Sequence, residues 1–347
     1  MSVEAASTGG RARRRPVARG RPSWIARRLR QRLVVALLSA LAAVALRLPD
    51  RFLHRASQVL GVVYYLLARE RRDLVRANLE RTCRGLVALG LADAPTAAAA
   101  RDHRALERLV RSAFGHYLRS YLEMLLTSRY DVEYVRERVV IETPEAVERA
   151  FAPGGGRIFL GLHFGAIEMP GIYVVHRAGR PVTAPMEIVA NPLLQAWLER
   201  TRGYTGVRVI PIRDARRHLR EVLARGEIAG LIADRDLLGN GLPVTIFGAP
   251  TTLPAGAAIL AYETGAPVYP AAVRRTGFGS YAARLLELEP PPRGPLRPWL
   301  HSFVERQARA YEELIASAPE QWWAIFFPLW PDLPGNESRS AGGAHPE

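Results

Sequence analysis

From about Val139 onward the chain alternates short apolar runs with amphipathic segments, and this alternation restricts the fold more than any other feature. The run Ile158 to Leu162 predicts a buried strand, and further runs begin near residues 182, 207, 228, 244, 268 and 282. Helical periodicity fills most of the intervals between them. The pattern predicts an α/β core over residues 139–332, with a mixed sheet flanked by helices.

Polar residues stand at the ends of three predicted strands, where functional side chains gather in open α/β sheets. The first strand stops at His163, and the second runs directly into Asp234, Arg235 and Asp236. One interpretation of the second segment is a substrate contact. The alternative is an ion-pair cluster that only fixes the loop.

A glycine- and proline-rich segment, residues 245–256, follows the third of these strands. It contains Gly248 and Gly256 and is expected to be a loop that opens a helix. Backbone N–H groups at such a helix start can hold an anion or an acyl carbonyl.

His163 and Glu168 form a candidate pair across the end of the central strand. A helix is expected from Gly165 to Val175. If the chain turns back at Gly165, the Glu168 carboxylate can reach the imidazole, giving a general base with an orienting acid. The alternative is that His163 caps the strand and Glu168 is a solvated acid favoured by the helix dipole. This stretch alone is compatible with both.

Several other chemistries lack their motifs. The sequence has no Gly-x-Ser-x-Gly nucleophile motif and no lysine for a phosphate-binding P-loop. The eight histidines show no His-Glu-x-x-His spacing, which argues against a catalytic metal, and no cofactor motif opens a βα unit. The single cysteine, Cys83, can form neither an intramolecular disulfide nor a cysteine-based zinc site.

The N-terminal part combines positive charge with apolar segments. The net charge of the chain is +15, all 48 basic residues are arginine, and ten of them lie in residues 1–32, an arm expected to be disordered. The 14-residue apolar run 33–46 is shorter than the roughly 20 residues of a spanning helix. Together with the apolar segment 56–68, it predicts membrane-associating helices over residues 33–68 with a basic collar on the cytoplasmic side. A signal peptide and a buried helix of a soluble core are the alternatives.

The remaining parts are simpler. Residues 69–138 are expected to form a helical segment packed on the core, and the polar tail 333–347 is expected to be disordered. The arginines precede an apolar helix and are not interleaved with aromatic side chains. This arrangement favours an anionic phospholipid surface over nucleic acid.

These blocks together resemble the lysophospholipid acyltransferase superfamily. The segment His163 to Glu168 resembles its His-x4-Asp/Glu motif. The blocks 234–248, 253–261 and 264–270, the early segment Arg76 to Leu79 and the ending 319–330 are similar to one branch. That branch contains the lipid A biosynthesis and phosphatidylinositol mannoside acyltransferases.

The resemblance implies a glycerolipid-acyltransferase-like fold on the cytoplasmic face of the cell inner membrane. The implied reaction moves a fatty acyl group from acyl-CoA or acyl-carrier protein to a hydroxyl of a membrane glycolipid, without a covalent acyl-enzyme. His163 would be the general base, and Glu168 would fix its tautomer. Arg235, flanked by two acids, would contact a phosphorylated substrate.

Two further points refine the resemblance. Glu187 and Arg202 resemble a Glu…Arg pair of the mannoside-type branch, which assigns Arg202 to a phosphate or sugar, although a surface arginine explains it equally well. The segment from Phe247 reads Phe-Gly-Ala-Pro where glycerol-phosphate members often carry Glu-Gly-Thr-Arg. This difference argues against a simple glycerol-3-phosphate acceptor.

Two other functions remain compatible with the sequence. One is a non-catalytic basic protein on the same scaffold that binds a membrane or nucleic acid. The other is a lysophospholipid hydrolase that uses water in place of the acceptor.

Overall fold

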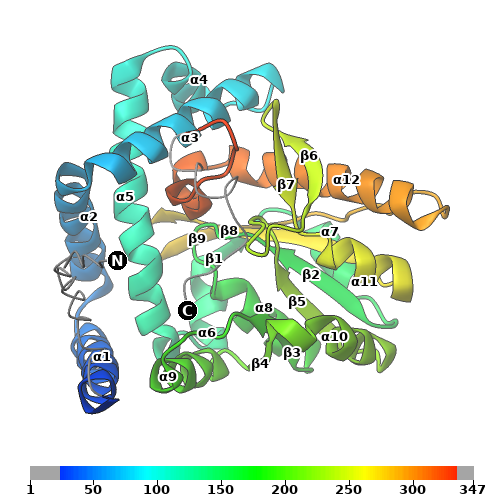
Figure 1. Ribbon diagram of the computed structural model, residues 1–347, viewed down its shortest axis with the longest axis horizontal. Helices are drawn as coiled ribbons and strands as arrows, with labels where there is room; N and C mark the ends of the chain where they lie inside the picture. The colour runs from blue at the N-terminus through cyan, green and yellow to red at the C-terminus, as the bar shows by residue number, and fades with distance from the viewer. Residues whose placement is uncertain (1–23, 334–347) are drawn as a thin grey trace, which may run out of the picture.

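The computed structural model describes residues 24–333, and its centre is a sheet with helices on both faces (Figure 1). Seven strands are arranged in the order β1-β9-β8-β2-β5-β3-β4. The strands are β1 (Val139–Ile141), β2 (Arg157–Gly161), β3 (Val182–Met186), β4 (Val207–Pro211), β5 (Ile228–Ile232), β8 (Val268–Gly277) and β9 (Ser280–Leu285). Every neighbouring pair is parallel except β8 and β9, which are antiparallel. The mixed α/β sheet predicted from the sequence is confirmed.

The central strand β2 lies between β8 and β5. Its pairing with β5 fixes the relative positions of the polar residues that follow these two strands. Its register with β5 runs from Arg157 opposite Ile228 to Gly161 opposite Ile232. The two strands are parallel and end level with each other. The residues that follow them therefore emerge side by side at the same edge of the sheet.

Alternate side chains of β2 are buried in two different cores. Ile158 and Leu160 pack on one face with helices α10, α11 and α12, whereas Phe159 packs on the other with α7 and α8. The helices of the core are α6 (Val132–Arg138), α7 (Pro144–Phe151), α8 (Met169–Ala178), α9 (Pro192–Gly203), α10 (Ala215–Ala224), α11 (Gly256–Thr264) and α12 (Leu296–Ala316). Burial on both faces explains the continuous apolar runs in the sequence.

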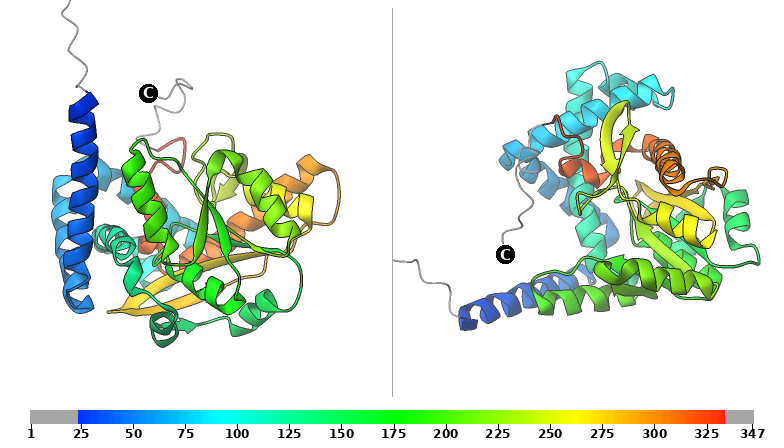
Figure 2. Two further views of the ribbon diagram at one scale, coloured as in Figure 1. Left: turned by 90° about the horizontal axis from the view of Figure 1, so that it is seen from below. Right: turned by 45° about the vertical axis from the view of Figure 1, so that its right-hand side comes forward.

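The N-terminal part is helical and lies to one side of the sheet, as Figure 2 shows. It comprises α1 (Trp24–Ala45), α2 (Asp50–Leu67), α3 (Arg69–Ala88), α4 (Ala94–Ala99), α5 (His103–Leu125) and a short 3₁₀ helix, Thr127–Arg129. None of the helices within residues 24–333 is both long enough and apolar enough to cross a bilayer.

The start of α1 differs from the expectation of a disordered arm over residues 1–32. Residues 24–32 belong to this helix, because Leu29 continues the helical spacing of Leu33 and Leu37 toward the N-terminus. The rest of the predicted arm, and all of the predicted tail beyond Leu333, lie outside the described residues.

Two segments near the strand ends also differ from the sequence prediction. The helix after His163 begins at Met169 and not at Gly165, because Gly165 adopts a left-handed φ of 50°. The segment expected as a loop forms a hairpin, β6 (Leu242–Ile246) and β7 (Ala249–Leu253). Its two-residue turn, Phe247 and Gly248, has φ values of 51° and 74°, typical of the turns that close tight hairpins.

The C-terminal segment joins the helical part to the sheet. It forms two 3₁₀ helices, Pro319–Gln321 and Trp323–Phe326. The buried Nδ2 of Asn78 on α3 donates hydrogen bonds to the carbonyl oxygens of Ile325 (2.7 Å) and Phe327 (3.0 Å). Helix α3 is therefore joined to the C-terminal segment by these two hydrogen bonds.

Within this segment, Glu320 provides a test of stability against pH. Burial raises the pKa of its carboxyl from 4.5 to about 6, and the nearby Asp93 adds to the rise. Ionisation therefore destabilises the folded state as the pH rises from 4.5 to about 6, and the cost stays constant above that. Because the side chain keeps some access to water, we expect Glu320→Gln to raise the free energy of unfolding by about 1–2 kcal/mol at pH 7.5. Urea unfolding should show that Glu320→Gln raises the free energy of unfolding very little below pH 4.5. An equal increase below pH 4.5 and at pH 7.5 would contradict the proposed effect of ionisation.

Candidate active site

His163 and Asp234 form a hydrogen-bonded pair at the carboxyl edge of the sheet. His163 follows β2 and Asp234 follows β5, so the adjacency of the two strands brings the residues together. The Nδ1 atom of His163 lies 2.7 Å from Oδ1 of Asp234. The Asp234 side chain is fully buried, and the His163 side chain is 20% exposed. A buried acid thus supports an imidazole that remains accessible from outside.

Three N–H groups surround the Asp234 carboxylate. Besides the ring, the backbone N–H of His163 donates to Oδ2 (3.0 Å), and so does Nε1 of Trp322 (2.8 Å). Burial alone would raise the pKa of Asp234, but the His163 ring and the hydrogen bonds from His163 and Trp322 outweigh it, and the pKa is lowered. Asp234 is therefore ionised at neutral pH.

The pairing assigns a tautomer to the neutral ring of His163. An ionised carboxylate accepts hydrogen bonds only, so Nδ1 carries the proton and Nε2 keeps its lone pair. Among the described residues, no atom forms a hydrogen bond with Nε2. The rings of Trp323 and His163 meet in a T-shaped contact, with centroids 4.5 Å apart. The imidazole is thus held at Nδ1 by Asp234, whereas Nε2 has no hydrogen-bond partner in residues 24–333 and the side chain as a whole is 20% exposed.

Trp322 and Trp323 are the site residues for which the sequence predicted no role. They belong to the closing segment of the family resemblance, but no residue pattern indicated that they reach the histidine. The backbone N–H of Trp323 donates to the His163 carbonyl oxygen (3.0 Å). Two adjacent tryptophans after the last helix were the available signal, because a buried indole N–H needs an acceptor.

The structure places Glu168 differently from the sequence prediction. Within the described part of the chain, no hydrogen bond or ion pair joins Glu168 to His163; Asp234 occupies Nδ1 instead. The turn at Gly165 moves the helix start to Met169, so Glu168 lies in the N-cap position. Burial raises the pKa of its carboxyl, which Arg202 partly counteracts. The acid that sequence spacing predicted beside His163 is Glu168, whereas the acid that the fold places there is Asp234.

Glu187 and Arg202, which resemble the family's Glu…Arg pair, lie apart from each other in their contacts. Glu187 is exposed after β3, and no ion pair joins it to Arg202 in residues 24–333. Arg202, at the end of α9, instead faces Glu168, and both line one cavity. A half-buried carboxyl with a neighbouring guanidinium is the arrangement that the structure shows.

The two residues after Asp234 make different contacts: Asp236 binds the following loop, and Arg235 is a half-buried cation. Asp236 accepts hydrogen bonds from the backbone N–H groups of Gly239 and Gly241 (both 2.9 Å) and from Oγ1 of Thr252 (3.0 Å). These hydrogen bonds connect the Asp236 side chain to the loop that follows it and to β7. The guanidinium of Arg235 lies over the ring of Phe327, with Cζ 3.5 Å from the centroid.

The two candidate glycines, Gly248 and Gly256, belong to different elements. Gly248 lies in the turn of the β6–β7 hairpin, whose left-handed backbone accounts for a glycine there. Gly256 is the exposed first residue of α11, where backbone N–H groups are left without helical partners.

An apolar cavity of about 140 Å³ lies against the loop that carries His163. Leu162 and Phe164, on either side of the histidine, line it together with Val174, Ile232 and the Glu168–Arg202 pair. A larger cavity of about 430 Å³ lies near α6, α7 and α8 and shares Phe159 and Val174 with the first. The smaller cavity is lined by both sequence neighbours of His163 and therefore borders the loop that carries the imidazole, although the ring itself is not one of its lining groups.

Nothing in residues 24–333 gathers three or more metal-binding side chains into a possible ion site. The chemistry available at this edge of the sheet is proton transfer at Nε2, next to an apolar cavity and cationic side chains.

Comparison with known proteins gives relatives of one kind. The chain is 30% identical over 162 residues to a phosphatidylinositol mannoside acyltransferase of Mycobacterium tuberculosis, covering 46% of this chain and 51% of the relative. It is 30% identical over 166 residues to the enzyme of the same name from Mycolicibacterium smegmatis, covering 47% and 54%. The matched region thus spans about half the length of these curated relatives.

The family comparison covers much more of the chain. The model of the bacterial lipid A biosynthesis acyltransferase family matches residues 23–330, which include the N-terminal helices, the His163–Asp234 pair and both tryptophans. The chain therefore belongs to the bacterial lipid A biosynthesis acyltransferase family.

Proposed function

We propose that this protein is a membrane-associated O-acyltransferase that moves a fatty acyl group from an acyl thioester to a hydroxyl of a membrane glycolipid. The observation that carries the proposal is the His163–Asp234 pair, in which Nε2 makes no hydrogen bond within residues 24–333 and the loop of the histidine borders an apolar cavity. Family membership supports the reaction class. The mannoside acyltransferases among its relatives support a phosphatidylinositol mannoside acceptor, with a lipid A precursor as the other candidate.

In the proposed reaction, Nε2 of His163 takes the proton from the acceptor hydroxyl. The oxygen attacks the thioester carbonyl, the carbon–sulfur bond breaks, and the imidazolium returns its proton to the leaving thiolate. The products are an ester and a free thiol, without a covalent acyl-enzyme. Asp234 keeps the ring in the required tautomer and stabilises the imidazolium.

The cavity beside the histidine loop is our proposed site for the start of the acyl chain. Its walls are mostly apolar, and Leu162 and Phe164 make it border the loop that carries His163. Burial of methylene groups there would supply binding energy, at about 0.8 kcal/mol for each. The thioester carbonyl would then lie at the cavity mouth, within reach of the attacking oxygen.

Three further contacts belong to the proposal. Arg235, held over Phe327, and Arg202, at the cavity wall, are positioned to receive phosphate or sugar oxygens. Exposed N–H groups at Gly256 would receive an anion or the thioester carbonyl. The donor is acyl-CoA or acyl-carrier protein, since both present the acyl group as a thioester.

The exposed face of α1 and α2 supports attachment to a membrane surface. Large apolar side chains on this face are 45% or more exposed: Leu29, Leu33, Leu37, Leu41, Val44, Phe52, Val59, Leu60, Val63, Leu66 and Leu67. Arginines 27, 28, 30 and 32 belong to the same helix α1. A helix that presents apolar and cationic residues to solvent lies in the interface of anionic phospholipids. We infer attachment to the cytoplasmic face of the inner membrane, where both thioester donors are available.

Reconstitution tests the proposed function. The full chain in anionic phospholipid vesicles would receive radiolabelled palmitoyl-CoA or palmitoyl-acyl-carrier protein, with a phosphatidylinositol mannoside or a lipid A precursor as acceptor. We expect label in the glycolipid, a mass increase of one acyl group and release of one thiol for each ester. Free fatty acid formed without an acceptor would favour a hydrolase, and no labelled glycolipid with any donor and acceptor would contradict the proposal.

A further inference from the structure

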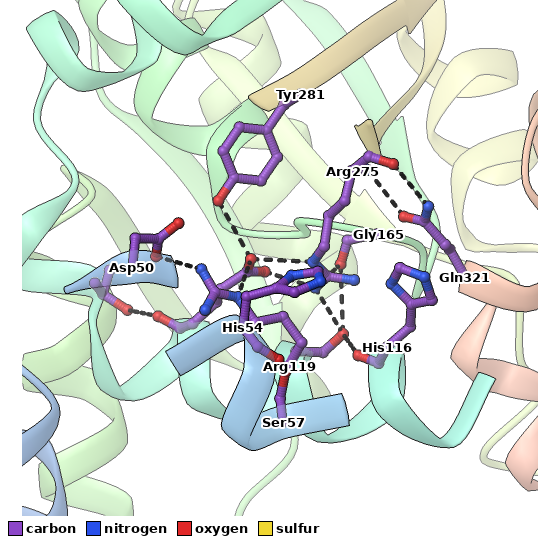
Figure 3. A network of polar contacts seen from close by, with 12 residues as sticks. Asp50, His54, Ser57, His116, Arg119, Gly165, Arg275, Tyr281 and Gln321 are labelled. Carbon is purple, nitrogen blue, oxygen red and sulfur yellow. Dashed lines mark hydrogen bonds and ion pairs between the residues drawn. The ribbon is translucent and has the colours of Figure 1, made fainter. Parts of the chain in front are cut away.

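A group of buried charges lies beneath the loop that carries His163. Arg119 and Glu123 project from α5, Arg275 comes from β8, and Asp50 is the first residue of α2. Figure 3 shows Arg119 and Arg275 converging from these elements, with Gly165 and Gln321 beside them. Arg119, Glu123 and Arg275 are each no more than 6% exposed.

Glu123 is the centre of this group. Arg275 donates two hydrogen bonds to its carboxylate, from Nε to Oε1 (3.0 Å) and from Nη2 to Oε2 (2.6 Å). Arg119 donates from Nε to Oε1 (3.1 Å) and from Nη2 to Asp50 (2.6 Å). Burial lowers the pKa of the nearby His54, and that of His116 to about 3, so both rings are neutral at pH 7. Two cations therefore face two anions, without net charge.

Only one of the two arginines reaches the histidine loop. Nη2 of Arg275 donates to the carbonyl oxygen of Gly165 (2.8 Å), two residues after His163. The Gln321 side chain binds the backbone of Arg275 in both directions, accepting from its N–H (2.8 Å) and donating to its carbonyl oxygen (2.9 Å). The backbone carbonyl oxygen of Gln321 accepts a hydrogen bond from the Gly165 N–H (3.1 Å). Both polar groups of Gly165 are thus tied to this cluster.

The geometry of Gly165 shows how closely the loop is held. Its backbone has a φ of 50°, and a Cβ there would lie 2.0 Å from the carbonyl oxygen of Val273. The next residue, Ala166, donates its N–H to that same oxygen (2.9 Å). A tight turn packed on β8 therefore transmits any movement of Arg275 to the residues on either side of Gly165.

Stability alone is a poor explanation for such a cluster. Burying charges is costly, and well-packed apolar replacements of buried ion pairs are often as stable or more stable. What an arginine adds is a planar fork with several donors in fixed directions, which can bind a carboxylate and a carbonyl oxygen together. A lysine ammonium lacks this geometry.

We propose that Arg275 is a positioning residue for His163: held by Glu123, it fixes the Gly165 carbonyl and thereby the orientation of the imidazole toward the acceptor hydroxyl. The inference rests on the proposed function, since it assigns a role in that reaction. Arg275 itself does not contact the reacting atoms.

Arg119 supplies a matched control. It is a buried arginine bound to the same carboxylate, but it lies on the side of Asp50 and makes no hydrogen bond to residues 163–166. The experiment compares Arg275→Met and Arg275→Lys with Arg119→Met and Arg119→Lys in the full chain reconstituted in vesicles. It measures kcat, the KM of palmitoyl-CoA and of the glycolipid acceptor, and the thermal midpoint of each variant.

We expect Arg275→Met to lower kcat by about 10–10²-fold, the scale of a misplaced reacting group, with each KM within about threefold. Arg119→Met should lower the thermal midpoint by a similar amount but leave kcat within about threefold. A further variant, Arg275→Ala, leaves space for a free guanidinium ion. Guanidinium ions at millimolar concentration should restore part of the rate of this variant, whereas sodium chloride of equal ionic strength should not.

Two outcomes would overturn the inference. One is wild-type kcat in a folded Arg275→Met, and the other is an equal loss of kcat in the matched Arg119 variant. If a methionine variant does not fold, the lysine pair decides by the same criteria. Wild-type protein that fails to transfer the acyl group would instead count against the proposed function, so the two failures are distinguishable.

Discussion

Replacing His163 by alanine is expected to lower the rate of acyl transfer by about 10²–10⁴-fold, the usual contribution of a positioned general base. The variant loses the atom that removes the hydroxyl proton, while the cavity walls, Leu162 and Phe164, stay in place. The KM of the acyl donor should therefore change little, and the loss should appear in kcat. Initial rates at saturating donor and acceptor measure this directly.

His103→Ala is the matched control for this variant. The His103 side chain is 74% exposed at the start of α5 and takes no part in the site. It should leave kcat and the thermal midpoint unchanged. A His163→Ala enzyme that keeps more than a tenth of the wild-type rate would exclude His163 as the general base.

Replacing Asp234 by asparagine is expected to cost about 10²–10⁴-fold in kcat, because it imposes the wrong tautomer on His163. The carboxylate accepts three N–H donors: the His163 ring, the His163 backbone and the Trp322 indole. An amide has one oxygen, which can serve the backbone and indole donors together. Its NH₂ group then faces Nδ1, which must accept, so the proton moves to Nε2 and the lone pair of the base is lost.

Glu168→Gln is the informative comparison, because sequence spacing assigned to Glu168 the role that we propose for Asp234. No hydrogen bond joins Glu168 to the ring, so we expect this variant to retain kcat within about tenfold. Nitrogen NMR of labelled imidazole should show protonation at Nε2 in Asp234→Asn and at Nδ1 in Glu168→Gln. The reverse order of activities would return the orienting role to Glu168.

Local patterns in the sequence were sufficient for most of the fold. Apolar runs of strand length and the helical spacing between them predicted the α/β core, and Pro144 to Phe151 forms the predicted helix, α7. Errors arose where glycine decided the backbone. Gly165 delays the start of α8, and the turn at Phe247 and Gly248 converts an expected loop into a hairpin.

The sequence by itself determined that a histidine ends the central strand and that Asp234 ends another. Both statements follow from runs of neighbouring residues, which carry their own burial pattern. Periodicity along the chain does not specify which strands become neighbours, because that depends on how distant helices pack on both faces. The structure places β5 beside β2 in register, and residues 71 apart thereby share a hydrogen bond.

The same limit applies to the rest of the site. Trp322 approaches Asp234 across 88 residues, and Arg275 approaches Gly165 across 110. Spacing in the sequence can suggest a partner only a few residues away, such as Glu168. The tertiary structure chose a more distant acid, because the ends of adjacent parallel strands meet at one edge of the sheet.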